Sequence, residues 1–350
     1  MHSKNEDNQK ILRLLRSNDD TNLELGFQLC VGLQGNYNQE VKQALRQFPI
    51  LCLRNGLETK FIRSLRRLTA FPESVSDTYQ DLAYFSGPVA KYKKEEGIPT
   101  ELWQLKGLHR LLLNNNHLKK LPGEIGLLKQ LHMLSLSGNP DLDLKDAFSK
   151  IKDMNSLHIL YIGDVQFTKL PIEIAQLIHL KQLHISQSQN LDIQDALRKI
   201  SRLRQLHALS IEASEVLNLS DEITQLKNLQ TLSLNDNSLE YFPEEILALG
   251  QLKELNIGEN KLATLPANIV QLKQLEILQL DYNELEQLPQ AIGQLESLQE
   301  LTLTGNFLIS LPEAISQLKN LRLLDLTDNY SLEIDREKVH NWLPNCKIIW

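Results

Sequence analysis

Residues that stabilise secreted domains or anchor proteins in membranes are scarce in this sequence. Its 350 residues include three cysteines, an odd number, which lie far apart at Cys30, Cys52 and Cys346. Such spacing offers no disulfide framework and favours a reducing compartment. No apolar run reaches the ~18 residues that a membrane-spanning helix needs, and the polar start MHSKNEDNQK does not fit a signal peptide. We therefore expect a cytoplasmic protein that does not insert into membranes.

Short catalytic motifs are also missing. The sequence contains no G-x-x-x-x-G-K-[ST] phosphate loop, no H-E-x-x-H zinc motif, no C-x-x-C pair and no G-x-S-x-G nucleophile motif. Basic charge is in deficit, since 44 acidic and 37 basic residues give a net charge of −7. A surplus of negative charge repels phosphate groups. The sequence therefore predicts a protein that is no enzyme, needs no cofactor and no metal, and does not bind nucleic acid.

What the sequence does contain is one pattern, repeated many times. The stretch LEILQLDYNELEQLPQAIGQ, residues 275–294, has close copies that begin at Leu252 and Leu298, each 23 residues away. Ten such units start, at intervals of 23 or 26 residues, at Leu108, Leu131, Leu157, Leu180, Leu206, Leu229, Leu252, Leu275, Leu298 and Leu321. A fixed period of this length indicates structural units stacked in a row.

Each unit combines a short strand with a return segment. In Leu278-Gln279-Leu280 the alternation predicts a strand with both leucines buried, and Pro289 opens the return where a missing N–H is tolerated. Stacked units would pair these strands in a parallel sheet at ~4.8 Å spacing. Asparagine recurs where each strand ends and predicts a ladder of amide hydrogen bonds to buried backbone groups. This ladder residue is, in order, Asn116, Asn139, Val165, Ser188, Ser214, Asn237, Asn260, Asn283, Asn306 and Asn329. The three substitutions could change the curvature, but ordinary divergence between repeats is the simpler explanation.

The full pattern, L-x-x-L-x-L-x-x-N-x-L-x-x-L-P-x-x-I-x-x-L-x-x, resembles the leucine-rich repeat family. The 23-residue L-P-x-x-I form is similar to the intracellular Ras-associated group and its bacterial relatives, and the resemblance covers roughly residues 98–350. It implies an α/β leucine-rich repeat solenoid, a horseshoe with a parallel concave sheet, an N-terminal helical cap and a C-terminal cap. It also implies protein recognition. Secreted members usually carry cysteine-rich caps, which this sequence lacks.

The repeat phase divides the chain into four parts. These are an N-terminal helical cap (1–47), irregular N-terminal repeats (48–107), regular leucine-rich repeats (108–335) and a C-terminal cap (336–350). A separate ligand-binding domain at 1–47 is the alternative to a cap. Between residues 108 and 342 we expect ten parallel strands, with α-helices only in the two 26-residue units, where NPDLDLKDAFSKI and SQNLDIQDALRKI show helical spacing.

We expect a partner to contact the side chains at the third, fifth and seventh positions of each unit. These positions point outward from the sheet and are not fixed by packing. The early units place apolar side chains there, edged by polar ones: Leu112, Met133, Ile159 and Tyr161, with Arg110 and His184. The later units place carboxylates there: Glu212, Glu254, Asp281, Glu300 and Asp325. Apolar patches with polar rims often mark interfaces, although strand-favouring residues also occur on any sheet. The pattern predicts a protein partner with an apolar anchor and a basic patch, bound by a monomer.

Histidines occupy one equivalent position in three successive units, at His109, His132 and His158. Adjacent strands would stack them about 5 Å apart, as a metal site or pH sensor would require. The alternative is an exposed polar position, which is favoured because other units place Lys181, Gln230 or Glu276 there. For the whole chain the leading hypothesis is a protein-binding scaffold, an adaptor in a bacterial signalling or regulatory assembly. The alternative is a structural or self-assembling spacer.

Overall fold

The computed structural model describes residues 2–17, 19–72, 89–92, 98–189 and 191–350. The chain forms two compact units, Met1–His158 (unit 1) and Ile159–Trp350 (unit 2). In the described residues, no helix is both long enough and apolar enough to cross a bilayer.

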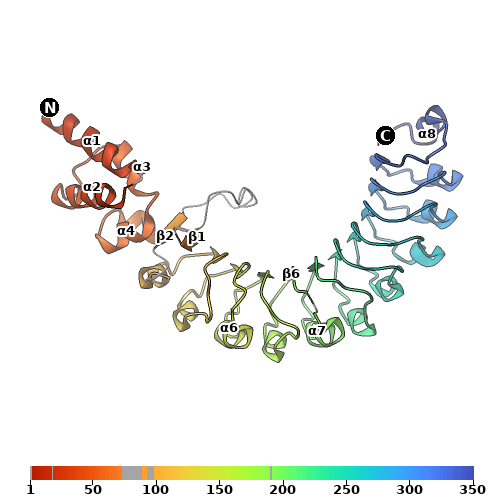
Figure 1. Ribbon diagram of the computed structural model, residues 1–350, viewed down its shortest axis with the longest axis horizontal. Coiled ribbons are helices and arrows are strands. Elements are labelled where there is room, and N and C mark those ends of the chain that lie inside the picture. The colour runs from red at the N-terminus through yellow and green to blue at the C-terminus, as the bar shows by residue number, and fades with distance from the viewer. Residues whose placement is uncertain (1, 18, 73–88, 93–97, 190) are drawn as a thin grey trace. The chain divides into compact units, whose positions relative to one another are not determined.

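Unit 1 begins with helices and continues into a parallel sheet (Figure 1). Its elements are α1 (His2–Leu15), α2 (Asp20–Gly32), α3 (Gln39–Leu45), α4 (Pro49–Arg54), α5 (Thr59–Arg63), β1 (Arg67–Pro72), β2 (Val89–Tyr92), η3 (Thr100–Gln104), β3 (Arg110–Leu112), η4 (Gly123–Leu127), β4 (Met133–Ser135) and α6 (Leu144–Ile151), where η marks a 3₁₀ helix. The strands pair in the order β2-β1-β3-β4.

Helices α1 to α3 confirm the helical character expected for residues 1–47. The Asp19 side chain caps α2 by accepting from the Asn22 N–H at 2.8 Å, which satisfies a backbone donor that a helix start leaves free. Helices α1 and α3 are tied together where the Asn38 N–H donates to Asn8 Oδ1 at 2.9 Å. Phe27 meets Phe48 edge to face, with ring centroids 6.0 Å apart. These contacts give the N-terminal helices a core of their own.

Residues 48–107, for which the sequence predicts irregular repeats, begin with helices. Residues 49–63 form α4 and α5 instead. Pro49 stands at the start of α4, where its fixed φ and missing N–H suit a helix, and Ile50 and Cys52 are buried. A step of three residues, as from Phe48 to Leu51, fits a helix as well as a repeat unit. Farther along, β1 pairs with β3, but β2 lies on the far side of β1, out of chain order.

Unit 2 consists of regular repeats. Its elements are β5 (Ile159–Gly163), η5 (Ile172–Gln176), β6 (Gln182–Ser186), α7 (Ile193–Ile200), β7 (Ala208–Glu212), η6 (Asp221–Gln225), β8 (Thr231–Ser233), η7 (Glu244–Ala248), β9 (Glu254–Asn256), η8 (Ala267–Gln271), β10 (Ile277–Gln279), η9 (Gln290–Gln294), β11 (Glu300–Thr302), η10 (Glu313–Gln317), β12 (Leu323–Asp325), α8 (Arg336–Trp342) and β13 (Lys347–Ile349). Within this unit the strands line the inner side of a curved stack, and the helices lie on its outer side (Figure 1).

The return segments follow the length of each unit. In the described part of residues 108–335, 23-residue units carry 3₁₀ helices, and the two 26-residue units carry α6 and α7, as expected. Both α-helices begin with an Asp cap, Asp143 or Asp192. Each helix is bonded to the preceding repeat through a lysine. Lys150 Nζ donates to the Leu121 carbonyl, and Lys199 Nζ donates to the Leu170 carbonyl. Helix α8 also falls within 108–342 and departs from the expected pattern.

The asparagine ladder is present in both units. In unit 2, Asn260 Nδ2 donates to the carbonyls of Leu234 (2.9 Å), Ile257 (3.2 Å) and Gly258 (2.9 Å). Its Oδ1 accepts from the Leu239 N–H at 3.0 Å. One amide thus pairs backbone groups of two successive repeats at the place where the buried chain turns. Wherever the ladder residue is asparagine, its amide joins neighbouring repeats in this way.

Three middle repeats, with Val165, Ser188 or Ser214 at the ladder position, pair the buried backbone groups differently. Ser214 Oγ donates to the Glu212 carbonyl at 2.7 Å and accepts from the Ser188 N–H at 3.3 Å, whereas Val165 has no polar side chain. Strands β5, β6 and β7 are five residues long, against three for β8 to β12. The longer pairing between strands supplies hydrogen bonds where the asparagine is missing.

The last repeat of unit 2 is covered by α8 and β13. Val339 of α8 is fully buried and Leu343 is 4% exposed. Strand β13 pairs with β12, and the Leu326 N–H donates to the Ile349 carbonyl at 2.8 Å. The Arg336 guanidinium lies 4.9 Å above the ring of Trp350. These contacts shield an apolar edge that would otherwise face water.

Replacing Asn260 by Ala should lower the free energy of unfolding by about 1–3 kcal/mol, because buried backbone groups lose their partners. Ser188→Ala removes a single 3.3 Å donor contact and should cost clearly less. Urea denaturation of both variants measures the difference. Equal midpoints for Asn260→Ala and the parent protein would contradict the role of the ladder.

Val339→Asp should detach the C-terminal cap, because it places a charge at a fully buried position, at a cost of more than about 2 kcal/mol. The uncovered apolar edge should then cause self-association, seen by light scattering. Asn341→Asp, on an exposed position of the same helix, is the control and should stay monodisperse. A soluble, monodisperse Val339→Asp variant would show that the cap is dispensable.

Candidate functional site

The outward side of the sheet in unit 2, here called the strand face, carries its side chains in straight rows. Parallel pairing in register aligns Ile159 with Gln182 and Ala208, and Tyr161 with His184 and Ser210. The same registration continues along the later strands of the unit. Residues that are 23 or 26 positions apart in sequence therefore become neighbours on one surface.

Tyr161 and His184 form a stacked pair on the strand face. Their rings are 4.2 Å apart and tilted by 8°, which follows from their register on β5 and β6. His184 Nε2 is buried and has no hydrogen-bond partner in the described structure. Burial lowers the pKa of His184, and the nearby Glu212 carboxylate opposes that shift. The pair thus presents an aromatic surface, and the one polar atom without a partner in it is buried.

The acidic residues expected on this face fall into two groups. Glu254 and Glu300 are exposed. Asp281 is held by the sheet itself, accepting from the Thr304 N–H at 2.8 Å and from the Thr302 hydroxyl. Asp325 likewise accepts from the N–H of Thr327 at 3.0 Å and from its hydroxyl at 2.6 Å. The two glutamates are less tied to the sheet: Glu254 Oε2 accepts one hydrogen bond, from the Thr231 hydroxyl at 3.3 Å, and both side chains are exposed to a partner.

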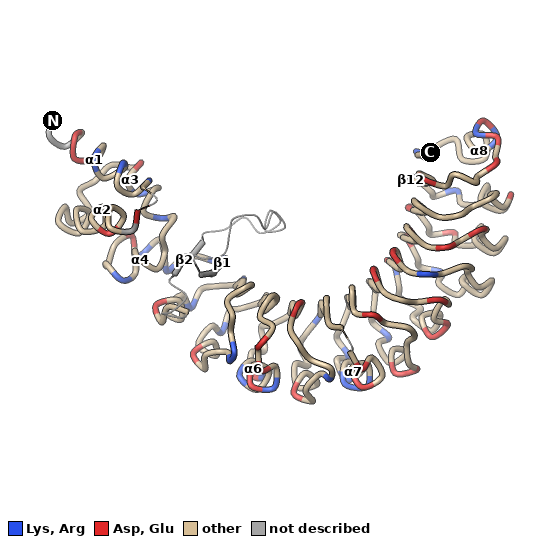
Figure 2. The backbone as a smooth tube through the Cα atoms, viewed as in Figure 1, with Lys and Arg blue, Asp and Glu red and all other residues tan. Residues whose placement is uncertain are grey.

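Sequence reasoning missed one residue of this surface. Strand β13 extends the sheet beyond the tenth unit and places Lys347 in register with Leu323. The alternation in KIIW, residues 347–350, after a helix with a clear Asp cap was the available signal. Lys347 adds a positive charge to the end of a row that otherwise carries Glu254 and Glu300. Figure 2 shows acidic positions recurring along the strands of unit 2 and basic positions on α7.

Two residues of the expected apolar stripe are not exposed. Leu112 and Met133 of unit 1 are 3% and 4% exposed, so the expectation that they face solvent is wrong. Met133 pairs in register with Arg110, and Leu112 lies between Thr69 and Ser135. Arg110 itself is half-buried. The sequence pattern alone does not give the exposure of an outward side chain.

The stacked histidines lie where the repeat phase placed them, in unit 1. The His109 and His132 rings are 5.0 Å apart and the His132 and His158 rings 5.5 Å apart. His132 Nδ1 is within 2.6 Å of the Gln130 carbonyl. In the part of the chain that the structure describes, no group of three or more His, Cys, Asp or Glu is arranged to hold a metal ion. The stack is consistent with an exposed polar row.

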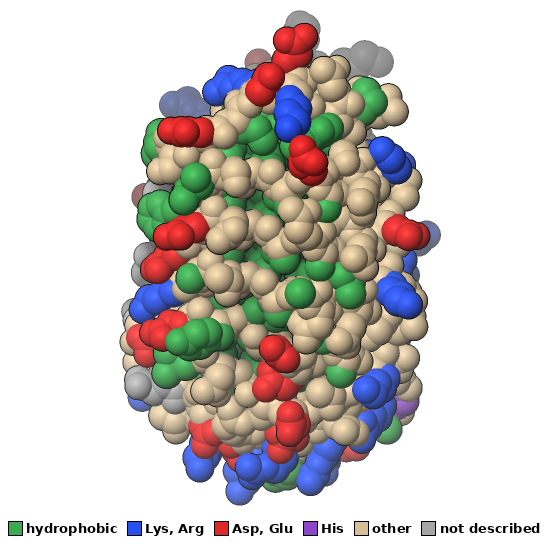
Figure 3. All heavy atoms as spheres, turned by 90° about the vertical axis from the view of Figure 1, so that its right-hand side faces the viewer, with side chains coloured by type: hydrophobic (Ala, Val, Ile, Leu, Met, Phe, Trp, Pro, Cys, Tyr) green, Lys and Arg blue, Asp and Glu red, His purple; other side chains and the backbone are tan. Residues whose placement is uncertain are grey.

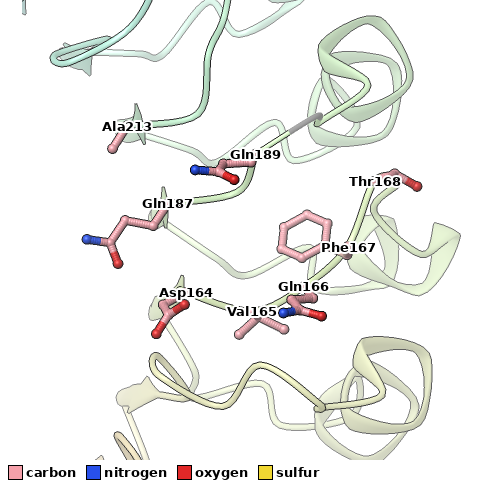
Figure 4. Close-up of a pocket in the computed structure, with 8 residues that line it drawn as sticks. All are labelled: Asp164, Val165, Gln166, Phe167, Thr168, Gln187, Gln189 and Ala213. Atoms are coloured by element: carbon pink, nitrogen blue, oxygen red, sulfur yellow. The ribbon is translucent and has the colours of Figure 1, made fainter.

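A hollow of about 850 Å³ opens in unit 2 beside the break in the asparagine ladder. Figure 4 shows the Phe167 ring between two loops, with Gln166 and Gln189 on either side of it. The two loops, 164–168 and 187–189, contain the ladder positions Val165 and Ser188 of two successive repeats.

The cysteines carry no sign of nucleophilic activation. All three are free, and Cys30 and Cys52 are buried in unit 1. Burial raises the pKa of Cys30 to about 11 and that of Cys52 to about 12. Their thiols therefore stay protonated at neutral pH, whereas nucleophilic attack needs the thiolate.

Comparison with known proteins agrees with this architecture. Residues 187–281 match the family described as leucine-rich repeat region, and residues 273–330 match the family described as leucine rich repeat. No curated protein sequence matches the chain. The fold expected from the sequence, an α/β leucine-rich repeat solenoid, is confirmed.

An internalin structure and a TLR13 structure show the same fold. An internalin (inlF) from Listeria monocytogenes aligns with 75% of this chain and 72% of its own, at 22% identity and a TM-score of 0.57. TLR13, in its complex with ssRNA13, aligns with 84% of this chain and 40% of its own, at 24% identity and a TM-score of 0.62. A leucine-rich repeat protein of Leptospira interrogans aligns with 83% of this chain and 91% of its own, at 28% identity and a TM-score of 0.47.

His184 should make stability depend on pH. Its pKa in the folded protein is lowered by burial, so below about pH 6.5 the unfolded chain binds a proton that the folded chain does not. Its stabilising contribution is therefore complete above about pH 6.5 and is lost as the pH falls toward the lowered value. The urea midpoint should fall less between about pH 8 and pH 5 in His184→Gln than in the parent. His117→Gln, at an exposed position, should behave like the parent; the same pH response in all three would contradict the prediction.

Proposed function

We propose that this chain is a non-enzymatic protein-interaction module that binds a protein partner on the strand face of unit 2. The stacked Tyr161–His184 pair carries the proposal. Aromatic rings on a rigid sheet give contact area with little loss of side-chain freedom, and such residues dominate interface energies. Ile159, half-buried on the same strand as Tyr161, completes the apolar anchor.

The charge of the face supports a partner with a basic patch. Glu254 and Glu300 are exposed, and Glu212 is half-buried beside His184. Several like charges on one rigid surface attract an opposite patch over a distance and speed association. Asp281 and Asp325 contribute charge while their oxygens remain bonded to threonines. Leu112 and Met133, being buried, are left out of the proposed contact, and Arg110 remains a candidate at the surface of unit 1.

A nucleic-acid ligand is the competing possibility, because the TLR13 structure is a complex with ssRNA13. On the strand face of unit 2, Lys347 is the one basic residue among the outward positions of the paired strands described above, against five carboxylates. Phosphate groups need basic partners, so we favour a protein. We further propose that the protein acts as a cytoplasmic monomer and as an adaptor in a signalling or regulatory assembly. A self-assembling spacer is the alternative, and it predicts concentration-dependent association of the pure protein.

The test is affinity capture from native lysate with the parent protein and with Tyr161→Ala, followed by titration of the captured partner. Tyr161→Ala should weaken binding about 30-fold at any ionic strength, the effect expected from losing a buried aromatic anchor. Glu300→Lys should weaken binding chiefly at low salt, because an exposed charge acts at long range. We choose Glu300 over Asp281 because a change at Asp281 would also break bonds to Thr302 and Thr304.

Leu217→Ala is the matched control, since this side chain is 64% exposed but belongs to a loop outside the strand face. It should bind like the parent. Binding that is unchanged by Tyr161→Ala and Glu300→Lys, or lost equally with Leu217→Ala, would place recognition on another surface.

A further inference from the structure

Large apolar side chains also lie exposed on the loops that follow β10, β11 and β12. They are Tyr282 (55% exposed), Phe307 (58%), Ile309 (54%) and Tyr330 (91%), here called the aromatic strip. On the side of the molecule shown in Figure 3, hydrophobic side chains gather among acidic ones. Solvent-exposed aromatic rings on three successive loops exceed what a soluble surface needs and commonly mark an interaction site.

Backbone hydrogen bonds hold these loops side by side. The Phe307 N–H donates to the Leu285 carbonyl at 3.0 Å, and the Ile309 N–H donates to the Glu286 carbonyl at 3.0 Å. The Glu333 N–H in turn donates to the Ile309 carbonyl at 3.0 Å. The strip therefore rests on a fixed framework that continues the ladder of the repeats.

The first ring of the strip is held flat by a glycine. A Cβ atom on Gly305 would lie 2.5 Å from Cδ1 of Tyr282, so the Tyr282 ring packs directly on the Gly305 backbone. Gly305 also has a φ of +66°, which disfavours any other residue there. One face of the ring is thus used for packing, and the rest of the side chain remains open to solvent.

The surroundings of the strip are strongly acidic. Residues 277–335 contain two basic residues, Lys319 and Arg322, and ten acidic ones: Asp281, Glu284, Glu286, Glu296, Glu300, Glu313, Asp325, Asp328, Glu333 and Asp335. The Lys319 ammonium is bonded to the Ser316 carbonyl at 2.6 Å. Glu284, Glu286 and Asp328 are exposed on the same loops as the rings. An occupant of this surface must therefore bring positive charge.

One contact joins a ring of the strip to a carboxylate. The Tyr330 hydroxyl donates to Asp328 Oδ1 at 2.8 Å, which fixes an anionic group beside an exposed aromatic ring. A guanidinium can stack on such a ring through its flat face while its N–H groups reach a carboxylate. Lysine lacks the planar fork and matches this pairing less well.

We propose that the aromatic strip binds an arginine-bearing basic segment of a protein partner. The guanidinium stacks on the rings of Tyr330 and Phe307, and its N–H groups donate to Asp328 or to the glutamates of the neighbouring loop. Ile309 contacts the aliphatic part of the segment. This surface lies on the loops after the strands, so it is a second site that goes beyond the binding proposed for the strand face.

The test uses a short fluorescent peptide that alternates arginine and glycine, titrated into the full chain at low ionic strength and followed by anisotropy. The double variant Phe307→Ala, Tyr330→Ala should bind at least about tenfold more weakly than the parent, because both stacking rings are lost. The same peptide with citrulline in place of arginine, which keeps the shape and removes the charge, should bind the parent at least about tenfold more weakly.

Two control variants separate this site from other acidic surfaces. Tyr241→Ala removes a ring that is 78% exposed but lies on an earlier loop, and it should bind like the parent. The double variant Glu254→Gln, Glu300→Gln removes charge from the strand face and should retain most of the affinity. Loss of binding in the strand-face variant but not in the strip variant would overturn this proposal and leave the proposed function standing.

Other results would also overturn it. An equal affinity of the citrulline peptide, or an equal loss with Tyr241→Ala, would show that no specific arginine site exists. Self-association of the parent that disappears in the strip variant would assign the strip to a second copy of this chain. Circular dichroism and the urea midpoint of each variant confirm that the changes leave the fold intact.

Discussion

A chain that turns while it is buried must find partners for its backbone groups, and this need shapes the repeats of both units. Asn260 shows the solution, with an amide that pairs three carbonyls and one N–H of two successive turns. Because the same bonds recur wherever the ladder residue is asparagine, they hold those successive strands in register. Register in turn aligns side chains into rows, and the rows form the surfaces that a partner can contact.

The region without ladder asparagines is also the region with the candidate anchor. Strands β5, β6 and β7 are two residues longer than the later strands of unit 2, which brings Gly163, Ser186 and Glu212 into the paired part of the sheet. Glu212 thereby comes close enough to influence His184, and His184 stacks on Tyr161. A change in how the backbone is satisfied and a change in the exposed face therefore occur together.

Unit 2 presents negative charge on two different surfaces. The strand face offers Glu254 and Glu300, and the loops after β10 to β12 offer Glu284, Glu286 and Asp328. The first surface lies beside a stacked Tyr–His pair and the second beside an open strip of rings. Both favour cationic partners, and their separate positions would allow two segments of one partner, or two partners, to bind at once. Linked weak contacts of this kind strengthen each other through effective concentration.

The sequence by itself determined the repeat period, the parallel strands, the ladder and the α-helical returns of the two 26-residue repeats, because these depend on contacts that recur at fixed spacing. The 3₁₀ helices of the 23-residue repeats came only from the structure. It also identified the rows that contain Tyr161 and Glu300. Only the tertiary structure decided which residues of those rows are available. Leu112 and Met133 are buried, Asp281 and Asp325 are held by threonines, and β13 brings Lys347 to the sheet. The sequence pattern likewise did not predict helices α4 and α5, because a spacing of three residues between apolar side chains fits a helix and a repeat equally well. Exposure depends on neighbours that are distant in sequence, which a local pattern does not contain.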